Sequence, residues 1–148
     1  MSYTVPSSPG NRSARVRVPA KRVALAGLVA VVAAVVAIAL VYFIGGALVS
    51  YHQDFQVLAT VGPAVSFTLF AGIGATLVYA LVLRLSRRPV RTFGIIAAVV
   101  FLLMLIPDLT LVPGMPGVTG GQTAVLLTMH VVAALVLVGV LLALTRPE

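Results

Sequence analysis

Four long apolar segments, separated by short polar ones, make up most of the chain. We expect a membrane-spanning helix in each of them, over residues 23–49, 59–84, 91–107 and 123–144. At 1.5 Å per residue these helices would be about 26 to 40 Å long, against a hydrocarbon core of roughly 30 Å. The pattern therefore predicts an all-α fold, a bundle of four transmembrane helices arranged as two antiparallel hairpins.

The polar segments between these stretches carry the turn signals. Residues 50–56 separate the first two helices, and we expect a solvated loop there, with Tyr51 and Phe55 at the membrane interface. Pro107 is expected to end the third helix, because proline removes a backbone donor and crowds the preceding turn. Small residues around Gly72 predict that the second helix closely approaches a neighbouring helix.

The composition places the chain in a bilayer. It is 61% hydrophobic and 9% charged, with a mean hydropathy of +1.17, whereas soluble domains carry about a quarter charged residues. There is no cysteine, which excludes disulfides, thiolate metal ligands and cysteine nucleophiles. We expect residues 1–21 to be a disordered, basic, cytoplasmic tail and residues 22–146 to form the transmembrane domain.

Basic residues are distributed unevenly along the chain. Five of the ten lie within residues 12–22, four lie within residues 84–91 and one lies near the C-terminus, while the segments around Asp54 and Asp108 have none. Because cytoplasmic loops are enriched in Lys and Arg, we expect a multi-pass membrane protein with both termini in the cytoplasm. The expected partner of this charge is the lipid bilayer and not nucleic acid. The residues assigned to headgroup contact and topology are Arg15, Arg17, Lys21, Arg22, Arg84, Arg87, Arg88 and Arg91.

His130 is the one ionisable residue inside the fourth apolar segment, where such a group is costly. Depths counted along the helices place Asp108 about 25 Å from Arg91, and His130 about 24 Å from Arg146. The two residues should therefore lie at the same height on neighbouring helices. We hypothesise a polar tier in the outer third of the bundle, in which Asp108 or a hydroxyl group pairs with His130. The members of this tier are His130, Asp108, Tyr42, Ser66 and Thr68.

Two interpretations of His130 remain open. It is either a buried histidine that hydrogen-bonds across the bundle, or a group that takes part in a proton relay or in ligand contact. A metal is not expected, because His130 and Asp108 supply two ligands where catalytic zinc typically has three. No cofactor is expected, and the spans contain no recognisable catalytic motif. With three acidic residues in the chain, an enzyme is the least favoured class.

Several features of the chain occur together in a known arrangement. They are a short basic tail, an arginine-rich middle segment, a third span ending in Pro107 and the run Leu127-Thr128-Met129-His130 in the fourth span. This arrangement resembles a family of small four-span integral membrane proteins of unknown function from actinobacteria, over about residues 22–144. The resemblance implies a four-helix fold in a bacterial inner membrane and implies no activity.

Three classes of function are compatible with these features. The first is a small accessory or structural bundle that packs against a membrane-protein partner or against itself as a homo-oligomer, which the small-residue clusters favour. The second is a small transporter or proton-linked carrier that uses the tier around His130 and Asp108. The third is a membrane enzyme acting on lipid-like substrates. A pocket lined by Tyr42, Ser66, Asp108 and His130 would favour transport or chemistry, and a closely packed tier would favour the accessory role.

Overall fold

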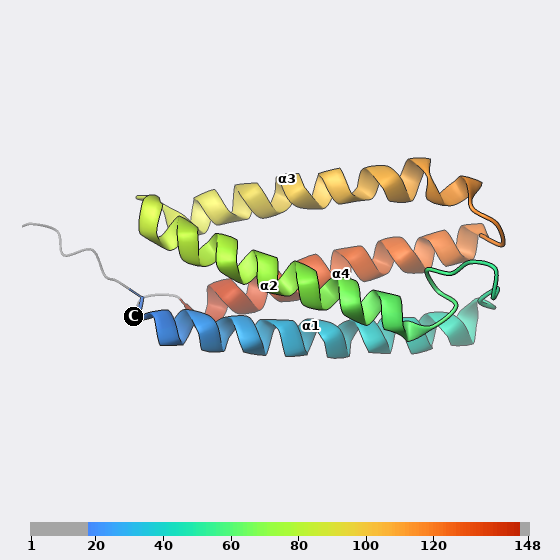
Figure 1. Cartoon of the computed structure of the whole chain (residues 1–148), viewed down its shortest axis with the longest axis horizontal. Coiled ribbons are helices and arrows are strands. Elements are labelled where there is room, and N and C mark those ends of the chain that lie inside the picture. The colour runs from blue at the N-terminus through green and yellow to red at the C-terminus, as the bar shows by residue number, and fades with distance from the viewer. Residues whose placement is uncertain (1–17, 146–148) are drawn as a thin grey trace, which may run out of the picture.

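The computed structural model describes residues 18–145, and four long α-helices account for most of them (Figure 1). They are α1 (Ala20–Leu48), α2 (Val61–Leu85), α3 (Pro89–Thr110) and α4 (Gly120–Leu144), with a short 3-10 turn, η1 (Val112–Gly114), before α4. This part of the chain contains no strand. Each helix is long and apolar enough to cross a membrane. The all-α class and the four apolar helices are therefore confirmed.

The helices begin and end within three residues of the predicted boundaries. Thr119 and Gln122 start α4 with a reciprocal cap, in which each backbone N–H donates to the side-chain oxygen of the other residue, at 2.8 and 3.3 Å. The prediction that Pro107 ends the third helix is wrong, because α3 continues to Thr110. Proline removes a single donor, and in hydrocarbon the remaining backbone groups have no alternative to helical bonds, such as that from Leu111 N–H to Pro107 O (2.8 Å).

Helix α1 is the most buried of the four and packs along both α4 and α2. Its contact with α2 depends on small residues on both sides. A Cβ atom on Gly27 would overlap the side chain of Thr76, and a Cβ atom on Gly72 would lie 2.5 Å from Val31 Cγ2. Carbon atoms in contact are normally about 3.5–4.0 Å apart, so the absence of these side chains is what permits the approach. The predicted close approach at Gly72 is confirmed.

Helix α3 is the least buried of the four helices, and it packs on the bundle with one face that includes the half-buried Ile96. Its two buried residues are Phe93 and Asp108. The Phe93 ring packs on Tyr79 of α2, with 4.8 Å between ring centroids, and the Tyr79 hydroxyl shares a 2.7 Å hydrogen bond with Thr145 Oγ1 beyond the end of α4. Between these two points α3 exposes large apolar side chains, and Figure 1 shows it at the edge of the bundle. In a bilayer, lipid chains can cover such a face.

The loop between α1 and α2 folds over one end of the bundle. Phe55 and Leu58 are almost completely buried there, together with Leu126 of α4. The Tyr51 hydroxyl donates to Tyr42 O (2.8 Å), and the Tyr42 hydroxyl donates to Leu58 O (3.1 Å). Burial raises the pKa of Tyr51 above its usual value of 10.0, and the neighbouring Tyr42 raises it further. The expectation that Phe55 faces the membrane interface is therefore wrong, because its ring is buried against other side chains of the bundle.

The second loop at this end, between η1 and α4, contacts the first. Gly117 has φ of +72°, which glycine adopts without strain, and a Cβ atom on it would lie 2.9 Å from Asp54 Cβ. His52 and Asp54 are themselves exposed, as expected for a solvated loop. The two loops thus form one compact cap over this end, which we call the capped end.

The two ends of the bundle differ in charge. The start of α1, the connection from α2 to α3 and the end of α4 lie together at the end opposite the cap (Figure 1). All the basic residues of the described chain lie at this end, which we call the basic end. Asp54 and Asp108 lie at the capped end. The described basic residues are Lys21, Arg22, Arg84, Arg87, Arg88 and Arg91.

Candidate functional site

An aspartate and a histidine meet between α3 and α4. Asp108 Oδ2 lies 3.0 Å from His130 Nδ1, and the two side chains are 10% and 31% exposed, respectively. Asp108 stands in the last turn of α3, at the capped end, and His130 stands two to three turns into α4, which runs in the opposite direction. The antiparallel arrangement is what brings residues 22 positions apart in the sequence to the same depth.

The ring nitrogen of His130 faces a second acceptor. Nδ1 is 3.1 Å from the carbonyl oxygen of Leu126, one turn earlier in α4. A single hydrogen on Nδ1 cannot point at both oxygens, and the geometry is that of a hydrogen bond for the Leu126 carbonyl only, because Asp108 Oδ2 has no hydrogen-bond partner among the described residues. The Leu126 carbonyl already accepts the backbone N–H of His130 within the helix, so the carboxylate is the acceptor that needs this hydrogen more. The pair is therefore a close contact between a buried carboxylate and a ring nitrogen, at ion-pair distance.

The other predicted members of the tier contact different groups. The Tyr42 hydroxyl bonds to the carbonyl of Leu58 in the cap. Thr68 is buried, and its hydroxyl donates to the carbonyl of Ala64 in its own helix (2.8 Å). Ser66 is exposed on the outside of α2. Within residues 18–145 no hydrogen bond joins these three side chains to Asp108 or His130. The structure brings together two of the five tier residues.

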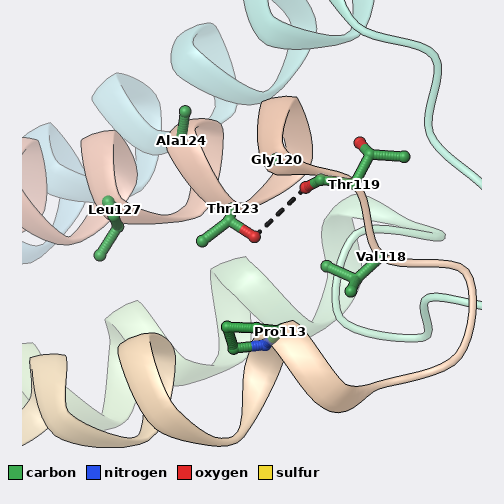
Figure 2. A pocket seen from close by; sticks show the side chains of 7 residues that line it. All are labelled: Pro113, Val118, Thr119, Gly120, Thr123, Ala124 and Leu127. Atoms are coloured by element: carbon green, nitrogen blue, oxygen red, sulfur yellow. Dashed lines mark hydrogen bonds between the residues drawn. The ribbon is translucent and has the colours of Figure 1, made fainter.

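A pocket of about 390 Å³ opens between η1 and the first turns of α4 (Figure 2). Figure 2 shows Pro113 on one side and Thr123 and Leu127 on the other, with the Thr123 hydroxyl donating to the Thr119 carbonyl (3.2 Å). Its lining is mostly apolar, and neither member of the Asp108–His130 pair lines it. Leu127 precedes His130 by less than one turn, so the pocket approaches the pair without reaching it. The lining residues are Pro113, Val118, Thr119, Gly120, Thr123, Ala124 and Leu127.

The site has two ionisable side chains, Asp108 and His130, and this limits the chemistry that it can perform. No group of three His, Asp or Glu side chains that could hold a metal ion occurs among residues 18–145. The Asp108–His130 pair can exchange a proton, and it can fix α3 against α4.

Sequence reasoning missed the polar groups that support the capped end. Gln122 is fully buried, and its Nε2 has no partner among the described residues, although its Oε1 caps α4. The signal for this role was the Thr119–Gln122 spacing of a capping box, which precedes the apolar segment. Leu58 is buried in the cap, and its carbonyl accepts the Tyr42 hydroxyl. No sequence pattern predicted this role, because a single leucine after a polar loop is also typical of a helix start.

The predicted headgroup and topology residues lie at the basic end where the structure describes them. The Arg22 guanidinium Nε donates to the Leu144 carbonyl (3.0 Å), which ties the start of α1 to the end of α4. Arg84, Arg87, Arg88 and Arg91 are exposed, as is Lys21. Arg15 and Arg17 of the predicted tail lie outside the described residues.

The comparisons with known proteins give a family for the chain and no activity. No curated protein and no solved structure matches the chain. One family matches residues 15–147, which include all four helices, the Asp108–His130 pair and the cluster of four arginines. On this match the chain belongs to the DUF6069 family, a family of unknown function.

Proposed function

We propose that this protein is a multi-pass protein of a bacterial inner membrane that works as a small accessory bundle, by packing against a second copy of itself or against a partner membrane protein. The observation that carries the proposal is the attachment of α3. This helix has two buried residues, Phe93 and Asp108, and exposes an apolar surface along the whole distance between them.

The first half of α3 has the small residues that close helix contacts use. Gly94 has no atom within 4 Å of the position of a Cβ, so no neighbour within the chain uses the space beside it. Ala98 lies one turn further along and is exposed. A small residue at every fourth position lets two helices approach closely in a membrane. By contrast, Gly27 and Gly72 are already occupied by the contact between α1 and α2.

The orientation that we propose follows from charge. All the described Lys and Arg residues lie at the basic end, and the positive-inside rule favours a cytoplasmic location for that end. Because the chain has no cysteine, single introduced cysteines can report on the orientation. In intact spheroplasts, an impermeant maleimide should label Asp54→Cys and should leave Arg87→Cys unlabelled. The reverse labelling pattern would contradict the proposed orientation.

The packing role is tested by measuring association in lipid. We expect Gly94→Leu to weaken self-association or recovery of a cross-linked membrane partner at least fivefold, because its side chain fills the space beside α3. Gly139→Leu is the matched control, since Gly139 on α4 also has no atom within 4 Å of a Cβ position. Förster transfer between labelled copies in liposomes, at several protein-to-lipid ratios, measures self-association. A chain that stays monomeric and carries no cross-linked partner would refute the proposal.

The Asp108–His130 pair supports a second candidate, a small proton-linked carrier. The observation in its favour is the 3.0 Å contact, which is suited to proton exchange, next to a pocket that opens less than one turn away along α4. The predicted signature of transport is a pocket lined by the tier residues themselves. Neither the pocket between η1 and α4 nor a second depression, on α2 and lined by Leu77, Ala80, Leu81 and Arg84, has such a lining. Proton uptake by proteoliposomes that is lost in His130→Leu would favour this candidate, and uptake that is unchanged would exclude it.

A further inference from the structure

The basic end carries a cluster of positive charge that the chain itself leaves uncompensated. Arg84, Arg87, Arg88 and Arg91 fall within eight residues and are all exposed. Among residues 18–145 their guanidinium groups form no hydrogen bond and no ion pair. The two acidic residues of this part of the chain, Asp54 and Asp108, lie at the opposite end of the bundle. Any anion that neutralises the four arginines must therefore come from outside the described chain.

The turn that carries these arginines is held in one conformation. The Ser86 hydroxyl shares a 2.8 Å hydrogen bond with Thr92 Oγ1 in the first turn of α3, and it accepts the backbone N–H of Arg88 (3.1 Å). Pro89 then begins α3 with its φ already suited to the helix. The charges are thus presented by an ordered connection, which lowers the entropy lost when an anion binds.

A shallow depression leads from this cluster into the depth of the membrane. It has a volume of about 260 Å³, and its lining consists of Leu77, Ala80, Leu81 and Arg84 on one outward face of α2. Leu77 lies seven residues from Arg84, about 10 Å along the helix axis. The small Ala80 side chain, between two leucines, forms the floor. The apolar part of this surface is suited to contact with a lipid acyl chain, and the arginine at its interfacial end is suited to contact with the lipid phosphate.

We propose that this surface is a binding site for an anionic phospholipid of the leaflet that the basic end faces, with the phosphate on Arg84 and one acyl chain over Leu77, Ala80 and Leu81. Arginine binds phosphate through two parallel hydrogen bonds and can reach from a helix end to the interface. The neighbouring Arg87, Arg88 and Arg91 add long-range attraction for an anionic headgroup. The site does not depend on self-association of the bundle, so the two proposals can fail separately.

The test measures lipid binding to the purified full chain in detergent, where the topological role of the arginines is not involved. Native mass spectrometry would compare phosphatidylglycerol with phosphatidylcholine of the same acyl chains. We expect phosphatidylglycerol to bind more tightly and Arg84→Gln to weaken it about tenfold, the loss typical of direct hydrogen bonds between charged groups. Arg84→Lys should recover part of the loss, because a lysine keeps the charge and lacks the planar fork.

Two controls separate a site from diffuse attraction. Arg87→Gln removes the same charge from the same turn without touching the depression, and it should change binding less than twofold. Ala80→Phe fills the depression without changing the charge and should weaken binding, whereas Ile73→Phe, at an exposed position of α2 outside the depression, should not. Equal affinity for the two lipids, equal losses in Arg84→Gln and Arg87→Gln, or full displacement by soluble glycerol phosphate would each overturn the proposal.

Discussion

Replacing Gly72 by alanine should destabilise the contact between α1 and α2, whereas the same change two residues later should not. An alanine Cβ at Gly72 would lie 2.5 Å from Val31 Cγ2 and 3.1 Å from Leu137 Cδ2. At Gly74 the added methyl group has no atom within 4 Å. The two positions are in the same helix, so they make a matched pair that differs in what the methyl group meets.

The expected magnitude follows from the overlap. A normal carbon–carbon contact is about 3.5–4.0 Å, so Gly72→Ala leaves Val31 at least 1 Å too close. Val31 cannot readily turn aside, because a β-branched side chain in a helix has one strongly preferred rotamer. Inserting an extra methyl group into a packed contact typically costs about 1–3 kcal/mol. Both variants gain up to about 1 kcal/mol of helix propensity, and this gain cancels when the two are compared.

We therefore expect Gly72→Ala to be about 1–3 kcal/mol less stable than Gly74→Ala. The free energy of unfolding can be measured by titrating the protein in mixed micelles with sodium dodecyl sulfate. Because the chain has no tryptophan, the unfolding is followed by far-UV circular dichroism and tyrosine fluorescence. If Gly72→Ala is as stable as Gly74→Ala, the close approach of α1 and α2 does not depend on the missing side chain, and the account of this contact is wrong.

Three further predictions concern the capped end. His130→Leu leaves Asp108 without its partner and should lower the free energy of unfolding by about 1–2 kcal/mol in the same titration. Replacing both residues by leucine should recover most of that loss. Equal stability of the single and double variants would contradict the pairing. Gly117→Ala forces an alanine to φ of +72° against Asp54 and should cost about 1–2 kcal/mol, seen as faster hydrogen exchange in the cap. Burial raises the pKa of Tyr51 in the folded state, so the stability that the neutral hydroxyl contributes is complete below pH 10 and is lost as the pH rises through the higher folded pKa. Tyr51→Phe should remove this pH dependence. Absorbance at 295 nm follows the ionisation of the tyrosine, and the free energy of unfolding is measured at each pH.

The sequence predicted the helices and the depth of the polar pair, because both depend on length alone. An apolar stretch must be about 20 residues long to span a bilayer, and a fixed rise per residue converts the distance from Arg91 to Asp108 into a depth. Antiparallel neighbours at equal depth can then be named without knowing their rotation. The contact between Asp108 and His130 at 3.0 Å is consistent with that arithmetic.

The rotation of each helix could not be predicted, and the tier depended on it. In water, an amphipathic pattern shows which face is buried, but these helices are apolar on every side, so the pattern gives no such information. Thr68 is buried and Ser66, two residues away, is exposed on α2. Their equal depth placed Thr68 and Ser66 in the predicted tier, but the rotation of α2 about its axis points neither side chain at His130. The folding of Phe55 into the cap was hidden for a related reason, since an aromatic residue beside a span is typical of the interface as well.

The loose attachment of α3 is a consequence of the solvent. In water, the exposed apolar side chains of α3 would be costly, but in a bilayer lipid covers them at no cost relative to protein. The contacts that hold α3 include a ring contact at Phe93, the packing of Ile96 on the core and a polar contact at Asp108. A second copy or a partner that replaced lipid along the middle of α3 would break none of these contacts. Association and stability should therefore be separable on this helix, with Gly94→Leu changing the first and changes at Asp108 changing the second.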